Sequence, residues 1–337
     1  MILKEFRELR RDHRTVAMLV AMPIVLLVIF GYAANFTVDD IPTRVLGPGA
    51  AQVEAGLPSL FDVQAADARA GEADAVALVR DGVVDVAIDT SAQPPTAYLD
   101  GSSLFSAQSA AAALGAAPEG RVAIEILFNP DLVTAWVMVP SLIGLILAFI
   151  GTIITSIGLV RERQTGTIEQ LAVMPLRPAD VIVGKIAPYF LLAAFDMVLV
   201  TALGVWIFDV PFSGSVWLFA LGAALFLFVV LGLGVLISTA SQTQAQAIQL
   251  AIMMLLPQIL LSGFVFPLAA MPAVVSWIGY ALPLTYFVDL SRGIMLRGAG
   301  FDSLWLNFAV LATMAVVIFT AAVLRFRRDL APRARSH

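Results

Sequence analysis

Residues 137–160 read VMVPSLIGLILAFIGTIITSIGLV, a stretch without a single charged side chain. The hydrocarbon core of a bilayer is about 30 Å thick, and a helix of roughly 20 mostly apolar residues crosses it. The stretch therefore predicts a membrane-spanning helix. Five more long apolar runs predict further spans: Thr15–Ala34, Ile186–Phe208, Val216–Thr239, Ala245–Leu268 and Leu304–Leu324. We expect an α-helical polytopic membrane protein with six transmembrane helices.

The overall composition agrees with this class. Of the 337 residues, 60% are hydrophobic and 13% are charged, whereas soluble domains are about 45–50% apolar and about 25% charged. The chain has no cysteine, and its two histidines, His13 and His337, lie near opposite ends. This excludes a disulfide framework and argues against zinc and thiolate chemistry. The net charge of -5 argues against a nucleic-acid partner. We expect no catalytic, cofactor-binding or metal-binding residues in this chain.

Basic residues are distributed unevenly around the predicted spans. Fourteen of the 20 lie in the N-terminal tail, in the loop after the second span, or in the tail of residues 325–337. Short cytoplasmic segments collect Lys and Arg, so both termini are expected in the cytoplasm, with the chain in the cytoplasmic membrane of a bacterium. The outer side keeps the other six: Arg44, Arg69, Arg80, Arg121, Arg292 and Arg297.

A seventh apolar piece, Ala273–Val288, is interrupted by Pro283. Proline ends or kinks a helix, and a piece of about ten residues is too short to cross a bilayer. Residues 268–300 are therefore expected to form a re-entrant hairpin on the outer side, between the fifth and sixth spans.

The N-terminal segment, residues 1–14, places apolar side chains at helical spacing among its charges. This pattern is typical of an amphipathic helix on the inner leaflet; a frayed basic tail is the alternative. The first span, residues 15–34, is longer than the apolar core of a signal peptide, which is about 7–15 residues. We expect a retained anchor.

Residues 35–135 are the only part that resembles a soluble domain. Strand-like and helix-like segments alternate there, and about 100 residues can bury a core of their own. We expect a small extracytoplasmic α/β domain with a solvated acidic surface and no catalytic group. The expected strands are Thr43–Leu46, Phe61–Ala65, Val83–Ile88, Thr96–Leu99 and Arg121–Phe128, and the expected helices are Ala50–Leu57, Ala70–Arg80 and Ser103–Leu114.

The cytoplasmic segment 161–185 contains the signal of a short helix. Gly166 interrupts the preceding helical pattern, and Thr167 followed three residues later by Gln170 is typical of a capping box. The following residues are amphipathic until Pro175 ends the pattern. We expect a helix over residues 166–173 that docks on a partner protein or lies on the membrane surface, and the pattern alone leaves both open.

Three motifs together resemble a known family. They are RERQTGTIEQLAVMPLRP at 161–178, NPDLVTAWVMVPSLIGLIL at 129–147, and the long segment 241–300, which ends in LPLTYFVDLSRGIMLRGAG. In this order they resemble the permease subunit of bacterial type 2 ABC exporters, in particular drug and multidrug exporters. The resemblance runs from the N-terminal helix to the last span and covers the external domain only in outline.

The resemblance implies a transport subunit that is not itself an enzyme. It would bind no cofactor, with ATP and magnesium held by a separate ATP-binding subunit. It would pair with a second permease copy, identical or related, and move a small hydrophobic or amphipathic compound (drug, antibiotic or lipid) out of the cell. The coupling helix that contacts the ATPase would contain Gly166, Thr167, Ile168, Glu169, Gln170 and Leu171.

The resemblance also places an outer gate in the hairpin region, with Phe266, Pro267, Pro283 and Tyr286 as candidates. One departure concerns Gln242, because relatives often carry a basic residue near this position. An ionic contact between this inner loop and the ATPase is therefore in doubt. No phosphate-binding G-x-x-x-x-G-K-[ST] motif occurs in the chain, so the energy would come from the partner.

Three intramembrane polar residues remain: Asp196, Gln246 and Gln249. A charge within a span is costly, so Asp196 is expected to face the bundle and find partners or a proton. Its role is structural, substrate-binding or proton-coupling, and the last would make the chain a secondary transporter. The two glutamines fit hydrogen bonds between helices or an inner vestibule. A third class of function is a non-transporting membrane protein whose external domain binds a ligand.

Overall fold

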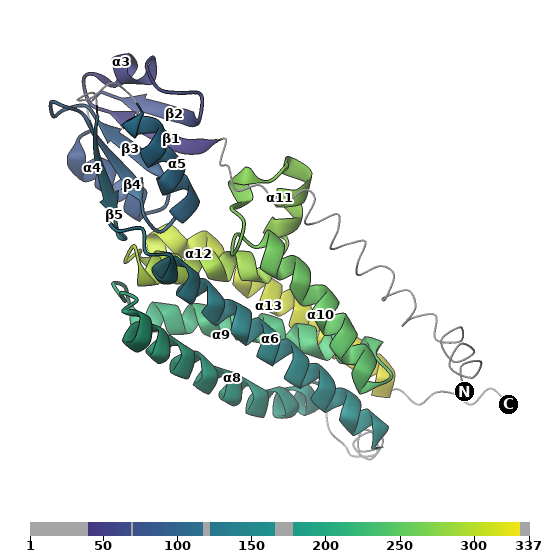
Figure 1. Ribbon diagram of the computed structural model, residues 1–337. Coiled ribbons are helices and arrows are strands. Elements are labelled where there is room, and N and C mark those ends of the chain that lie inside the picture. Colours follow the sequence, from purple (N-terminus) through teal and green to yellow (C-terminus); the bar gives the residue numbers. More distant parts are fainter. Residues whose placement is uncertain (1–39, 69, 117–121, 166–177, 331–337) are drawn as a thin grey trace, which may run out of the picture.

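The protein is described by a computed structural model that covers residues 40–330 except 69, 117–121 and 166–177. An α/β domain lies at one end of an elongated bundle of helices (Figure 1). The predicted N-terminal helix (1–14), first span (15–34) and coupling helix (166–173) lie outside the described residues, as does most of the C-terminal tail.

The α/β domain contains a five-stranded sheet in the order β2-β1-β3-β4-β5. All neighbouring strands are parallel except β3 and β4, which are antiparallel. The strands are β1 (Ile41–Leu46), β2 (Phe61–Asp67), β3 (Val86–Asp89), β4 (Thr96–Asp100) and β5 (Ala123–Leu127). The helices are α3 (Ala50–Glu54), α4 (Glu72–Arg80) and α5 (Leu104–Gly115). All eight predicted segments are confirmed, with ends shifted by a few residues.

Both faces of this sheet are covered, because side chains along a strand alternate between faces. Val45, Ile88 and Leu99 pack with α5 on one face, while Leu46 and Tyr98 pack with α4 on the other. The domain therefore has a core on each side of its sheet and is built of three layers.

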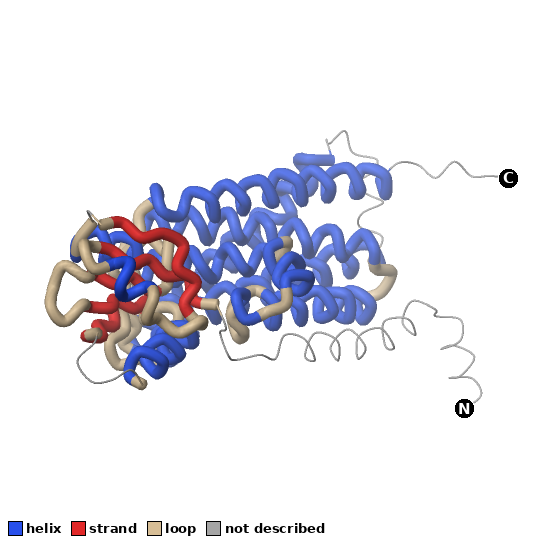
Figure 2. Tube along the Cα trace, turned by 90° about the horizontal axis from the view of Figure 1, so that it is seen from above, coloured by secondary structure: helices blue, strands red, loops and turns tan. Residues whose placement is uncertain are grey.

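The bundle contains five described helices that are long and apolar enough to cross a membrane. They correspond to the predicted spans other than Thr15–Ala34. Helix α9 lies at the centre and contacts α6, α8, α10, α12 and α13, while α8 and α13 leave most of their apolar surface uncovered. Figure 2 shows the strands gathered at one end of these helices. The helices are α6 (Thr134–Gln164), α8 (Pro178–Phe208), α9 (Val216–Ala240), α10 (Gln244–Leu261) and α13 (Phe301–Leu330).

Helix α10 is shorter than the predicted span Ala245–Leu268, whose C-terminal boundary was wrong. The helix ends at Leu261, because Gly263 two residues later adopts φ +79, which a right-handed helix cannot contain. The chain then turns through residues 262–267 into a short 3-10 helix, η1 (Leu268–Ala270). Phe266 and Pro267 therefore lie in a turn and not in a span.

The break predicted at Pro283 is confirmed. Helix α11 (Ala273–Tyr280) and helix α12 (Pro283–Met295) meet at an angle of 80°. Two hydroxyls fasten the bend, since the Thr285 hydroxyl donates to the Gly279 carbonyl and the Tyr286 hydroxyl donates to the Tyr280 carbonyl, both at 2.6 Å. The Gly279 carbonyl also accepts from the N–H of Leu282 at 3.0 Å, so these bonds add side-chain partners to carbonyls at the end of α11.

Helix α12 packs deeply against α6 and α9. The Phe287 ring stacks on Phe226 of α9 with centroids 4.6 Å apart. On the α6 side Gly144 permits this approach, since a Cβ there would lie 2.4 Å from Cδ1 of Phe287. The position of α12, which carries much of the candidate site, is thus fixed by its neighbours.

The ends of the bundle differ in chemistry. Four of the five tryptophans lie near helix ends, Trp136, Trp217 and Trp305 at the starts of α6, α9 and α13 and Trp206 at the end of α8, and the fifth, Trp277, lies on α11. These helix ends and α11 are on the side of the bundle that carries the α/β domain (Figure 1). Arg161 and Arg163 lie at the other end of α6. Tryptophan collects where a membrane meets water, so the five mark one membrane boundary, beside the α/β domain.

Candidate functional site

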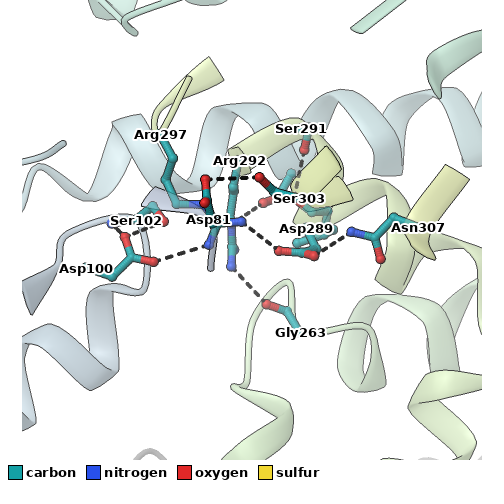
Figure 3. Close-up of polar contacts among 12 residues, drawn as sticks. Asp81, Asp100, Ser102, Gly263, Asp289, Ser291, Arg292, Arg297, Ser303 and Asn307 are labelled. Atoms are coloured by element: carbon teal, nitrogen blue, oxygen red, sulfur yellow. Dashed lines mark hydrogen bonds and ion pairs between the residues drawn. The ribbon is translucent and has the colours of Figure 1, made fainter. Parts of the chain in front are cut away.

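Arg297, in the loop between α12 and α13, joins the α/β domain to the bundle. Its Nη1 lies 3.3 Å from Oδ2 of Asp100 at the end of β4, and its Nη2 lies 3.1 Å from Oδ1 of Asp289 on α12 (Figure 3). The Arg297 side chain is 8% exposed and that of Asp100 is fully buried, whereas Asp289 is 53% exposed. The ion pair with Asp100 is thus a buried charge contact between two parts of the fold.

Further hydrogen bonds hold both carboxylates. The backbone N–H and the hydroxyl of Ser102 donate to Oδ1 of Asp100 at 2.8 and 2.6 Å. Nδ2 of Asn307 on α13 donates to Oδ2 of Asp289 at 2.6 Å. Buried charges are tolerated when they are paired and hydrogen-bonded in this way.

A second contact joins the same two parts. The hydroxyl of Ser303 on α13 donates to Oδ1 of Asp81 at 3.0 Å. Next to it, Gly82 adopts φ +70, and a Cβ there would lie 2.9 Å from Nη1 of Arg297. A larger residue at position 82 would therefore press on the guanidinium that makes the ion pair.

Arg292 on α12 ties together three segments within the bundle. Its Nε donates to the Ser141 hydroxyl at 2.8 Å and to the Val137 carbonyl at 3.3 Å, both on α6. Its Nη1 and Nη2 donate to the carbonyls of Gly263 and Phe264 at 3.3 Å each. The guanidinium therefore satisfies carbonyls of the turn that ends α10 and holds that turn against α6 and α12.

A cavity of about 550 Å³ lies between the α/β domain and this end of the bundle. Two buried polar atoms in its wall have no hydrogen-bond partner among the described residues, Oγ of Ser262 and Nε of Arg297. Its polar wall includes Asp85, Ser102, Ser103, Asp289, Arg292 and Asn307, and its apolar wall includes Leu104, Phe105, Met138, Phe264, Leu268 and Leu306.

Asp85 is the carboxylate of the α/β domain that lines this cavity. Burial raises its pKa from the ordinary 3.8 to about 6, and the nearby charge of Asp100 acts in the same direction. Hydrogen bonds from Ser106 and Ser103 and the charge of Arg297 oppose the rise. Asp85 is half-buried, so at neutral pH it places a negative charge in the cavity wall that is only partly compensated.

The three predicted intramembrane polar residues have different environments in the structure. Asp196 on α8 is half-buried and forms no hydrogen bond or ion pair with any described residue. Gln246 caps its own helix, since its N–H donates to Oγ1 of Thr243 at 3.3 Å and its Oε1 accepts from the N–H of Gln242 at 3.0 Å. Oε1 of Gln249 is buried without a partner in the described part of the chain. Among the described residues no bond joins these three into one site, and the bonds of Gln246 stay within residues 242–246.

The four outer-gate candidates divide into two groups. Pro267 and Tyr286 line the cavity. Phe266 lies instead in a small apolar cluster with Leu260 and Met271, and Pro283 is buried as the first residue of α12. The coupling candidates, residues 166–171, lie outside the described residues. Within the described ranges, no three His, Cys, Asp or Glu side chains gather as a metal site would require.

Sequence reasoning missed the two arginines as site residues. Arg292 and Arg297 stand five positions apart in SRGIMLRGAG, where they were used only to assign topology. The usable signal was their position, because two arginines in a largely apolar segment need buried partners. Asp100 carried no signal, since its partner is 197 residues away in the chain.

Comparison with known proteins gives a consistent result. A family model described as "ABC-2 family transporter protein" matches residues 13–324. The probable multidrug ABC transporter permease YbhR of Escherichia coli K12 is 35% identical over 203 residues, which cover 60% of this chain and 55% of that protein. The inner membrane transport permease YhhJ of the same strain is 36% identical over 211 residues, 61% of this chain and 56% of that protein.

This chain thus aligns with little more than half the length of those two relatives. The probable multidrug ABC transporter permease YbhS, also of Escherichia coli K12, is 28% identical over 366 aligned residues, which cover 98% of this chain and 96% of that protein. Several long apolar helices and a family match over nearly the whole sequence lead to one conclusion. The chain is a membrane protein that belongs to the ABC-2 family of transporters.

Proposed function

We propose that this chain is the membrane-spanning permease subunit of an ATP-driven exporter. It works with a second permease copy, identical or related, and with separate ATP-binding subunits that hold the ATP and magnesium. It moves a small hydrophobic or amphipathic compound, such as a drug, an antibiotic or a lipid, out of the cell. The observation that carries this proposal is the family match over residues 13–324, and the relatives named as multidrug permeases support the substrate class.

The proposed topology has six spans with both termini in the cytoplasm of a bacterium. An amphipathic helix (1–14) and the first span (15–34) precede an extracytoplasmic domain (35–135), the remaining membrane region (136–324) and a cytoplasmic tail (325–337). Arginines at the end of α6 support a cytoplasmic location for that end. The bent pair α11–α12, within 268–300, then enters from the outer side as a re-entrant hairpin.

Energy would reach the bundle through residues 166–171, which lie in the short loop between α6 and α8. The N-terminal amphipathic helix would be a second contact with the ATPase. Pro267 and Tyr286 support an outer gate at the cavity, since they line it, whereas Phe266 and Pro283 would act through packing.

A proton-coupled carrier centred on Asp196 has less support, because Asp196 has no hydrogen-bonded relay partner among the described residues. The alternative of a non-transporting protein with an external ligand-binding domain does not explain the match to a transporter family.

The test uses inside-out vesicles from cells that express this chain with its ATPase, and it measures ATP-dependent uptake of a lipophilic dye. Glu169→Ala is expected to reduce uptake at least tenfold at equal expression, while the matched control Glu125→Ala, on exposed strand β5, leaves it unchanged. An uncoupler and Asp196→Asn are expected to have little effect. Uptake that needs no ATP and disappears with an uncoupler or with Asp196→Asn would refute the proposal.

A further inference from the structure

The cavity between the α/β domain and the bundle has the size and the wall chemistry of a ligand site. Its volume of about 550 Å³ falls within the range of roughly 300–1,000 Å³ that is usual for small-molecule pockets. Its lining combines apolar residues, among them Phe105, Phe264 and Leu306, with the carboxylates Asp85 and Asp289. A molecule that suits both kinds of lining residue is amphipathic.

The charges around the cavity determine whether a positively or a negatively charged molecule is favoured. Both guanidinium groups already have acceptors, because Arg297 pairs with Asp100 and Asp289 and Arg292 donates to carbonyls and a hydroxyl. The Asp85 carboxylate accepts hydrogen bonds only from serine hydroxyls, and the positive charge that acts on it is the more distant one of Arg297. The two arginines and three aspartates leave one negative charge in excess when all are ionised. A cation reduces this excess, and an anion increases it.

Two residues of the lining carry a buried polar atom that has no hydrogen-bond partner among the described residues. Ser262 is 1% exposed and lines the cavity, yet its hydroxyl has no partner among the described residues. Nε of Arg297, also in the wall, lacks an acceptor within the same described ranges. Both atoms are buried, so a molecule in the cavity would contact the charged and apolar residues of the lining and not these two atoms.

We propose that this cavity binds organic monocations, with the cationic centre beside Asp85 and the apolar part against Phe105, Phe264 and Leu306. The site lies at the end of the bundle marked by the tryptophans, so it would hold a compound at the outer membrane boundary. This proposal rests on the proposed export function for its biological role, but binding itself is measurable without transport.

The test measures equilibrium binding of radiolabelled tetraphenylphosphonium to the full chain with its ATPase in lipid nanodiscs, with empty nanodiscs as background. Tetraphenylborate has the same four phenyl rings and the opposite charge, so it separates charge from shape. We expect saturable binding of the phosphonium ion and competition by tetraphenylborate that is at least tenfold weaker than by unlabelled phosphonium.

Two variants test the charged and the apolar lining residues separately. Asp85→Asn keeps the shape and removes the charge, and it is expected to weaken phosphonium binding at least tenfold. Leu306→Trp fills the apolar part and is expected to weaken binding without changing the charge. The matched control Asp131→Asn alters an exposed carboxylate outside the cavity and should change binding less than twofold.

The outcomes separate this proposal from the export function. Unchanged phosphonium binding by Asp85→Asn, or stronger binding of tetraphenylborate, would overturn the cation site while ATP-dependent dye uptake still supported export. Asp85-dependent phosphonium binding in a protein whose vesicles show no ATP-dependent uptake would support the site and refute the export function.

Discussion

Replacing Arg297 by Met should destabilise the junction between the α/β domain and the bundle. The substitution keeps an apolar stem but leaves the fully buried Asp100 carboxylate without its counter-charge. Breaking a buried pair in this way costs about 3–5 kcal/mol. The lower end applies here, because Ser102 still donates two hydrogen bonds to Asp100. Asp289 is 53% exposed, so its lost pair adds at most about 1 kcal/mol. The expected total is about 3–4 kcal/mol.

The assay is reversible unfolding in mixed micelles with increasing SDS, followed by tryptophan fluorescence and circular dichroism. The double variant Arg297→Met/Asp100→Asn removes both charges of the pair, so it should recover about 2 kcal/mol relative to the single variant. The control is Arg80→Met. Its pair with Asp81, at 3.2 Å, lies on the surface with side chains 52% and 35% exposed, and its loss should cost less than about 1 kcal/mol.

Two results would refute this reasoning. One is a loss in Arg297→Met no larger than that in Arg80→Met, which would mean that burial adds nothing to the pair. The other is a double variant less stable than Arg297→Met alone, which would mean that the unpaired charge of Asp100 is not the cause of the loss.

Three further predictions concern other contacts. The pKa of Asp85 is about 6 in the folded protein, above its ordinary 3.8, so the folded state holds the proton more tightly and stability falls as pH rises from about 4 to 6. The Asp85→Asn variant should lack this pH dependence in thermal unfolding and should be more stable than the wild type at pH 7 by at most about 3 kcal/mol. Gly144→Ala places a Cβ 2.4 Å from the Phe287 ring and should lower stability by about 1–3 kcal/mol, whereas Gly184→Ala, with open space around it, should not; equal melting temperatures would contradict this. Ser141→Ala removes the hydroxyl that accepts a hydrogen bond from Nε of the half-buried Arg292 at 2.8 Å. It should lower the free energy of unfolding by about 1–3 kcal/mol, and with it the melting temperature. An unchanged melting temperature would show that the carbonyl acceptors of Arg292 suffice.

Hydropathy predicted the existence of the spans better than their ends. The run at 137–160 lies within α6, which extends to Gln164, because a helix continues past the hydrocarbon core as long as its backbone stays paired. At α10 the predicted span is longer than the helix, whereas at α6 it was shorter. Uncharged residues continue to Leu268, but the backbone turns at Gly263. The turn is signalled by the Ser262–Gly263 pair, which a search for long uncharged runs does not register.

The site was harder to predict than the fold, because its contacts join distant parts of the chain. Asp100 is the last residue of strand β4 and Arg297 follows helix α12 of the bundle, and no periodicity relates them. Asp196 illustrates the converse. Its position within a span indicates that it needs a partner, but no sequence pattern identifies that partner, and the described residues supply none.

Arg292, which is half-buried, and Arg297, which is buried, determine which parts of the molecule can move separately. Arg292 binds the turn after α10 and the start of α6, and Arg297 binds the α/β domain to α12. Separating the domain from α12 breaks the buried ion pair, at about 3–5 kcal/mol, and separating the other segments breaks hydrogen bonds to a charged group, at about 1.5–3 kcal/mol each. Ser303 and Asn307 also hold the start of α13 to Asp81 and Asp289. Helix α8 presents a mostly uncovered apolar face, and apolar side chains slide without breaking directional bonds. A rearrangement of this bundle is therefore least costly when the domain, α12, the α10 turn and the starts of α6 and α13 move as one unit, carrying the cavity wall with them.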